Sequence, residues 1–348
     1  SINEGKDWVP FKNGFPSVST MDLVIQEKES ALVVGTFGRA IWVLDDLKCL
    51  REIVRGNTKE KITSLPMNEV IQVKGLFIAP PGNIWTGFGT TFEGENRPFQ
   101  EAAIPIYIND LPSKEDKVEG FILNSKGDTI QKLTTQLLVQ GLNYIQWKLD
   151  ENRVYLSGNY DPNESRGIPV LPGTYIAVIK YKGVQSSTSI KVISDPRFKM
   201  KEEVDQELYR YNKALNFEVG RLKSFFNLIN SWESELKKIH ETLSKQTKNE
   251  KALKNVNGMI EMVKQLKLVG KDSPGDRQVG AWQSVRITPA SAINEAEKVA
   301  MARVDIPSEQ DWKRISDAAT LIDNYKLQLS QFEDSSWKKF IKLYRKSN

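Results

Sequence analysis

A seven-residue repeat of apolar side chains most strongly constrains how this 348-residue chain can fold. From Leu208 to Leu243 an aliphatic residue recurs at every seventh position, and a second heptad position is aromatic or aliphatic except at Glu218. This spacing places both sets along one seam of an α-helix. The sequence therefore predicts a long helix from about 202 to 246 whose seam packs against other helices.

Two further apolar patterns of helical period follow the heptads. A stripe from Leu253 to Val263 marks a second helix, and a stripe from Trp312 to Phe340 marks a third. We therefore expect residues 198–348 to form a long-helix hairpin or a three-helix bundle. The stripes are interpreted as core rather than as a cofactor site.

The chain before residue 198 has the short period and the turn residues of β-structure. Strand-like runs occupy residues 21–26, 31–35, 40–44, 104–108, 118–123, 144–149, 175–179 and 188–192. The first three suit one blade of a β-propeller within residues 1–55. The rest suit an immunoglobulin-like β-sandwich within residues 101–197, with a start as early as 66. Residues 56–100 are expected to be a linker with an aromatic, glycine-rich loop, so the fold class is multi-domain, β plus α.

Composition excludes several functions. Lys plus Arg number 49 against 44 for Asp plus Glu, and no basic block carries interleaved aromatics, so nucleic-acid binding is not expected. No apolar run is long enough to span a membrane. The single cysteine, Cys49, and the single histidine, His240, leave little material for a disulfide, a catalytic triad or a histidine-based zinc site. We predict no catalytic residue, cofactor or metal site in this chain.

The first residues resemble a known propeller repeat. Ser1, Gly5 and Trp8 match the Asp-box of sialidase and sortilin-type propellers, whereas Asn3 and Asp7 stand where Asp and Thr are expected. Asn still fits a turn because its side chain bonds to backbone amides. The segment is therefore similar to a degenerate Asp-box.

The resemblance extends along the chain. Residues 8–46 resemble the closing blade of bacterial sortilin-like, Asp-box (BNR) repeat proteins often labelled glycosyl hydrolases, although Phe37 stands where histidine is expected. Residues 94–99, 141–147 and 171–175 resemble the immunoglobulin-like domain that follows the propeller in such proteins, and a helical tail follows there too. The resemblance implies a secreted, periplasmic or cell-surface protein.

It also implies a non-catalytic role for this region. Sialidase-type chemistry uses an arginine cluster, a tyrosine nucleophile and acidic partners spread over several blades, which one blade cannot supply. We expect the chain to support a propeller and to bind a protein or a glycan. Because the sequence opens inside an Asp-box, residues 1–50 are expected to need upstream blades or a partner chain carrying them. Two alternatives remain: a propeller-type glycoside hydrolase with its active site on upstream sequence, and an accessory region of a peptidase.

Four residues are candidates for ligand contact. Trp85, Phe88 and Phe92 lie on the glycine-rich loop, where exposed rings would stack on sugars or grip a peptide. The alternative is an ordered linker. Arg39, with Asp45 and Asp46 nearby in sequence, would either form ion pairs and turn caps or contact an anionic ligand in the propeller channel.

Overall fold

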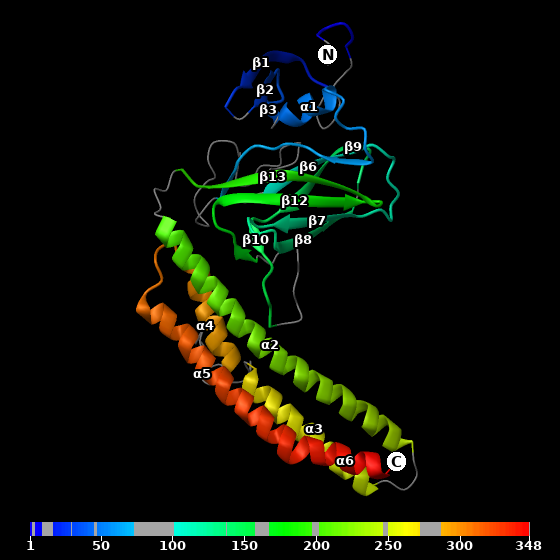
Figure 1. Ribbon diagram of the computed structural model, residues 1–348, viewed down its shortest axis with the longest axis vertical. Helices are drawn as coiled ribbons and strands as arrows, with labels where there is room; N and C mark the ends of the chain where they lie inside the picture. Colours follow the sequence, from blue (N-terminus) through cyan, green and yellow to red (C-terminus); the bar gives the residue numbers. More distant parts are fainter. Residues whose placement is uncertain are drawn as a thin grey trace. The chain divides into compact units, whose positions relative to one another are not determined.

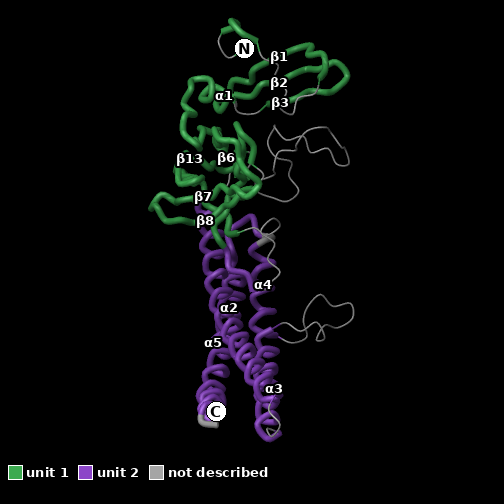
Figure 2. Tube along the Cα trace, turned by 90° about the vertical axis from the view of Figure 1, so that its right-hand side faces the viewer, with its two compact units in different colours: residues 1–152, 166–200 green, residues 153–165, 201–348 purple. Residues whose placement is uncertain are grey.

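A computed structural model describes residues 1, 4–8, 17–28, 30–44, 47–72, 101–136, 138–156, 167–196, 202–245, 250–271 and 287–347. They form a mixed β and α structure, as the sequence predicts (Figure 1). The chain divides into a β-rich unit, residues 1–152 and 166–200, and a helical unit, residues 153–165 and 201–348 (Figure 2). The helical unit thus takes a segment from between two strands of the β-rich unit.

The N-terminal sheet is a three-stranded antiparallel meander. Its strands β1 (Thr20–Gln26), β2 (Ala31–Thr36) and β3 (Ile41–Leu44) pair in chain order and coincide with the first three predicted strands. A helix that the sequence did not predict, α1 (Leu47–Val54), follows. The buried Cys49 thiol on α1 donates to the Pro66 carbonyl at 3.4 Å, which ties the helix to the next segment.

Two larger sheets follow in the β-rich unit. One has the strand order β5-β13-β12-β7-β8, the other has the order β4-β6-β9, and β10 pairs with β11 alone. Every pairing is antiparallel except the one between β5 and β13. Two short strands lie in the stretch 56–100 that was predicted as a linker. The bounds are β4 (Ile62–Ser64), β5 (Val70–Gln72), β6 (Ala102–Ile108), β7 (Val118–Leu123), β8 (Thr129–Thr135), β9 (Gly141–Trp147), β10 (Asp150–Glu151), β11 (Ile168–Pro169), β12 (Gly173–Tyr181) and β13 (Val184–Ser194).

One hydrophobic core draws side chains from both of these sheets. Ile104 and Ile106 of β6 are fully buried with Ile122 of β7 and Ile179 of β12. Strand β12 alternates buried and exposed residues, as expected for a strand with one covered face. Trp147 at the end of β9 is also fully buried, and its indole N–H donates to the Asp150 carbonyl at 2.9 Å.

The hairpin between β12 and β13 shows how local sequence sets the register. Lys182 and Gly183 both have positive φ, 45° and 81°, the geometry of a two-residue type I′ turn. The Lys182 ammonium lies 2.8 Å from the Asp116 carboxylate. Bonds from Lys182 and from the Ser113 amide lower the pKa of Asp116 to about 2. The turn is thereby fastened to the loop before β7.

The helical unit is built on α2, the long helix that the heptad repeat predicts. Its bounds, and those of the elements after it, are α2 (Glu202–Ser244), α3 (Glu250–Gly270), α4 (Pro289–Ala302), α5 (Glu309–Phe332), a π-helical turn (Glu333–Trp337) and α6 (Lys338–Ser347). The sequence did not predict α4, although Thr288 and Ser291 form a capping box and Pro289 lies in the first turn.

The seam of α2 forms the core of the helical unit. Leu222 and Ile229 are fully buried, and they pack in one cluster with side chains of α3, α4 and α5. Glu218, the exception in the heptad pattern, is buried too. Its carboxylate lies 2.8 Å from Arg221, which also pairs with Asp323 of α5. A polar exception in the sequence is therefore neutralised inside the seam.

The segment after β10 is anchored to the helices. The Arg153 guanidinium lies 2.6 Å from Glu297 of α4, and the Val154 amide donates to Asn216 of α2 at 2.8 Å. Val154 and Leu156 pack against the helical core. These contacts explain why the segment belongs to the helical unit.

Candidate functional site: the N-terminal sheet

The N-terminal sheet is apolar on both faces. Residues directly opposite each other in an antiparallel ladder have their side chains on the same face, so the register assigns each residue to a face. The first face carries Leu23, Ile25, Leu32, Val34, Trp42 and Leu44. The second face carries Val24, Val33, Val43 and Ile41, together with Asp22, Gln26, Ala31 and Gly35.

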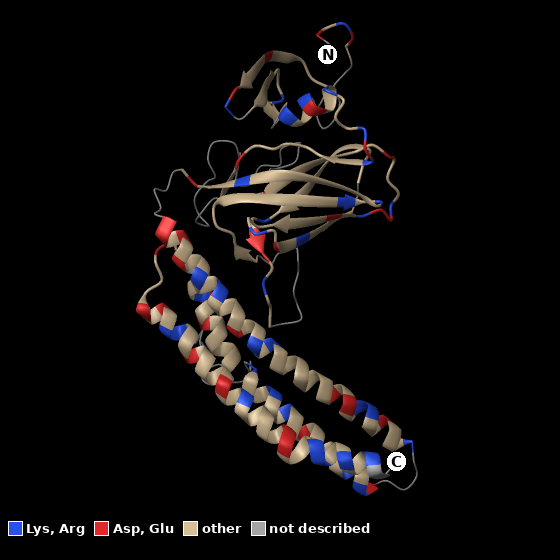
Figure 3. Ribbon diagram, viewed as in Figure 1, with Lys and Arg blue, Asp and Glu red and all other residues tan. Residues whose placement is uncertain are grey.

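Much of this apolar surface is exposed. Leu23 and Ile25 on the first face are 58% and 48% exposed, and Val24 and Ile41 on the second face are 55% and 63% exposed. All seven residues of β1 are exposed, whereas Val34 in the middle strand is buried. Figure 3 shows the sheet almost wholly in tan, because Lys, Arg, Asp and Glu are scarce on its strands. Contiguous exposed apolar surface of this kind makes the sheet the candidate docking surface among the described residues.

The turn between β2 and β3 holds Arg39, the one candidate ligand residue that lies within the described residues. The Arg39 carbonyl accepts the Trp42 indole N–H at 2.8 Å, and Thr36 donates from its hydroxyl to the Ala40 carbonyl. Arg39 is exposed at this tip, next to Phe37, which is 74% exposed. The backbone of the tip is fixed while both side chains face outward.

The segment that resembles an Asp-box forms a compact turn. The Gly5 amide donates to the Ser1 hydroxyl at 2.8 Å, and Gly5 has a φ of +84°, which suits glycine. Trp8 is 79% exposed. The Trp8 ring therefore adds to the exposed apolar surface of the N-terminal region.

The other candidates lie outside the described residues. These are Trp85, Phe88 and Phe92 of the glycine-rich loop, and Asp45 and Asp46 after β3. Their positions relative to Arg39 and their roles therefore stay predictions. Sequence reasoning had a signal for the sheet itself, since Leu23-Val24-Ile25 and Leu32-Val33-Val34 lack the alternation of a one-sided strand.

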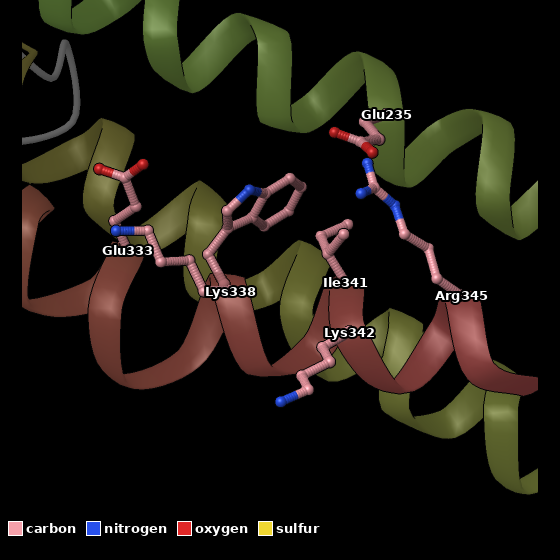
Figure 4. A pocket seen from close by; sticks show the side chains of 7 residues that line it. Glu235, Glu333, Lys338, Ile341, Lys342 and Arg345 are labelled. Carbon is pink, nitrogen blue, oxygen red and sulfur yellow. The ribbon is translucent and has the colours of Figure 1, made fainter.

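The helical unit carries a groove between α2 and α6. It has a volume of about 470 Å³ and a floor of Trp337 and Ile341. Figure 4 shows Glu235 and Arg345 extending toward each other from opposite walls. The lining mixes both signs of charge over an apolar floor and offers no pairing of a nucleophile with a base. The remaining lining residues are Glu333, Lys338 and Lys342.

The buried carboxylate of Asp311 has a structural role. Burial alone would raise its pKa, but hydrogen bonds from Ser308 and the charge of Arg303 outweigh burial, and the net effect is a lowered pKa. Arg303 lies 2.7 Å and Arg314 3.1 Å from the carboxylate, which also caps the start of α5. This group is a helix cap joined to an ion-pair network.

The described residues contain neither a cluster of metal ligands nor a membrane-spanning helix. No three His, Cys, Asp or Glu side chains within the described ranges could hold a metal ion together. His240 is partly buried on α2, with its ring 3.4 Å from the Ser244 hydroxyl. Across the same residues, no helix is both long and apolar enough to cross a bilayer.

Comparisons with known proteins found no match for this chain. It matches no protein-family model, no curated protein and no solved structure.

Proposed function

We propose that this chain is the non-catalytic C-terminal region of a secreted Asp-box propeller protein, in which the N-terminal sheet packs as a blade between neighbouring sheets. In this proposal the two larger sheets form an immunoglobulin-like sandwich and the helices form a bundle, and both mediate protein or glycan contacts. The observation that carries the proposal is the sheet with two apolar faces.

The physical argument is the number of faces that need covering. A sheet in a two-layer fold buries one face and exposes polar residues on the other. Here the row Val24–Val33–Val43 lies on one face, and the row Leu23–Val34–Trp42 lies on the other. A propeller blade has a neighbour on each side and so needs both faces apolar.

The energetic argument points the same way. Burying an aliphatic side chain contributes about 1.5–3 kcal/mol. Leu23, Val24, Ile25, Ile41 and Val43 are all at least 44% exposed in this chain. Flanking sheets would therefore gain several kcal/mol from covering them, enough to hold a blade in place.

The chemistry of the described residues supports a non-catalytic role. Three of their buried carboxylates have structural partners: Asp311 is held by a cap and ion pairs, Glu218 by an ion pair, and Asp150 by backbone and amide donors. Asp150 accepts from the Gly167 amide at 2.5 Å and from Gln131 at 3.0 Å. The first bond ties β10 to the residue before β11 and the second ties it to β8, so the carboxylate has a structural role.

The coding sequence before Ser1 is the first test. Repeated Asp-boxes without a cluster of Arg, Tyr and Glu would support the binding role. The same repeats with such a cluster would favour the glycoside hydrolase alternative, and the absence of propeller repeats would overturn the proposal.

A stability measurement on the longer protein is the second test. Ile41→Lys should change the free energy of unfolding by no more than about 0.5 kcal/mol in the 348-residue chain, because the side chain is 63% exposed. In a protein with the flanking blades the lysine would be buried without a partner and should cost about 3–5 kcal/mol. Equal effects in the two proteins would contradict blade packing.

A further inference from the structure

The outer edge of β1 is a surface distinct from the two faces of the sheet. β1 is an end strand of the meander, and no strand of the described residues pairs with its outer side. An open edge presents backbone donors and acceptors that template pairing with another strand. Natural sheets block such edges with lysines, prolines or bulges. β1 has one bulge near its start, between Thr20 and Asp22, and Asp22 is its one charged residue.

The hydrogen bonds of β1 indicate which of its residues direct their backbone N–H and C=O groups toward the open edge. The Leu23 amide donates to the Asp22 carboxylate at 2.8 Å, which places this amide on the side away from β2. Alternate residues of a strand direct their backbone groups to the same side, so Leu23 and Ile25 present donors and acceptors outward and Val24 does not. An arriving carbonyl would replace the local bond to Asp22.

We propose that a second copy of this chain pairs with the β1 edge in antiparallel register about Val24. In this register Val24 lies opposite Val24 of the second copy, Leu23 lies opposite Ile25, and Asp22 lies opposite Gln26. The outward backbone groups of Leu23 and Ile25 then form the hydrogen-bonded pairs, and Val24 occupies a non-hydrogen-bonded pair on the dyad.

Side-chain type within β1 favours this register. Shifting the centre to Leu23 would put Asp22 opposite Val24, which gives the carboxylate no polar neighbour across the strands. Shifting it to Ile25 would put Val24 opposite Gln26. The register about Val24 places aliphatic residues opposite aliphatic residues and gives Asp22 an amide partner. The pairing joins two meanders into one six-stranded sheet and leaves both apolar faces free, so it does not rest on the propeller proposal.

The edge of β3 is the natural comparison. β3 has 4 residues against 7 for β1. Val43 lies in the same row and on the same face as Val24, at the opposite edge of the sheet, and is 44% exposed. Substitutions at Val43 therefore control for effects of the shared face.

Sedimentation equilibrium of the 348-residue chain tests the pairing. We expect a monomer–dimer equilibrium with a dissociation constant of roughly 1–100 µM, as for small interfaces. Val24→Lys sets two ammonium groups side by side at the dyad and should abolish the dimer, whereas Val43→Lys should leave it intact. A chain that is monomeric up to 200 µM, or equal loss of the dimer in both variants, would overturn the proposal. Equal loss would assign association to the face, and so would bear on blade packing instead.

Disulfide trapping tests the register itself. Two cysteines at a non-hydrogen-bonded antiparallel pair have Cα atoms about 4.5 Å apart, within reach of a disulfide. Val24→Cys should give a covalent dimer on mild oxidation, and Val43→Cys should not. The unsubstituted chain controls for Cys49, which is 2% exposed. Comparable dimer from both variants, or none from Val24→Cys, would contradict the register.

Discussion

The ring of Tyr325 on α5 occupies the space that a side chain at Gly270 would need. A Cβ atom built on Gly270 would lie 2.5 Å from Cζ of that ring and 2.7 Å from its hydroxyl oxygen. The hydroxyl donates to the Leu266 carbonyl at 2.9 Å, one turn earlier in α3. Burial raises the pKa of Tyr325, in keeping with a phenol held among apolar side chains. The absence of a side chain at Gly270 therefore fixes how closely α3 and α5 approach.

Gly270→Ala should consequently destabilise the protein by about 1–3 kcal/mol, because the Tyr325 ring must move and strain the core. In an unobstructed helix the same change is stabilising by up to about 1 kcal/mol. Gly258→Ala, also on α3, is the matched control, since nothing lies within 4 Å of its added Cβ. Chemical denaturation of both variants should give opposite signs. The same sign for both would mean that α3 and α5 are not packed as described.

The seam of α2 should be the most sensitive part of the helical unit. Ile229 is fully buried, and Ile229→Ala should lower the free energy of unfolding by about 2–5 kcal/mol through loss of contacts and a residual cavity. Asn230, the next residue, is exposed, and Asn230→Ala should change stability by less than about 0.5 kcal/mol. Similar losses from both variants would contradict the heptad seam.

Acid should weaken the β-rich unit through Asp116. The pKa of this carboxyl is lowered from 3.8 to about 2, so the ionised form is the one favoured by folding. The stabilisation is complete above about pH 5 and is lost progressively as the pH falls through the folded pKa of about 2. Asp116→Asn should therefore be less stable than the unsubstituted chain at pH 6, and the difference should shrink toward pH 2. Lys182→Met should reduce the pH dependence in the same window, because Lys182 is the main cause of the shift. A pH-independent difference between Asp116→Asn and the unsubstituted chain would argue against this pairing.

Purified chain should not hydrolyse aryl glycosides. The prediction follows from the single histidine and from the structural roles of the buried carboxylates at Asp150 and Asp311. Release of nitrophenol from a panel of nitrophenyl glycosides is the measurement. Hydrolysis that disappears with one point substitution in this chain would refute the non-catalytic role.

Sequence patterns identified the long elements well and the short ones poorly. The α2 helix was predictable from a heptad repeat that continues over five heptads, from Leu208 to Leu243. Strands β1 to β3 were predictable from runs rich in β-branched residues. The strands β4, β5, β10 and β11 have 2 or 3 residues each, too few to show a period. Helix α4 is rich in alanine and has a weak apolar stripe, so its capping residues were its main signal.

The site was only partly foreseeable. Continuous apolar runs indicate a sheet covered on both sides, and the register then shows which side chains share a face. Which edge stays open depends on pairing between strands, which no single segment encodes. Likewise, the segment Arg153-Val154-Tyr155-Leu156 has no periodic pattern that predicts its packing against the helices, because its partners are distant in sequence.

The contact between Arg153 and Glu297 affects the order in which the two units can fold during synthesis. Arg153 is joined to a glutamate 144 residues later in the chain. At ribosomal rates of about 5–20 residues per second, the partner emerges roughly 7–30 s after the arginine. Strands β10 and β11, which flank residues 153–165, can pair before that time. Until the helices form, Val154 and Leu156 then remain exposed to solvent. The β-rich unit can thus form early, but the nascent chain holds an apolar loop exposed until its last helices are made.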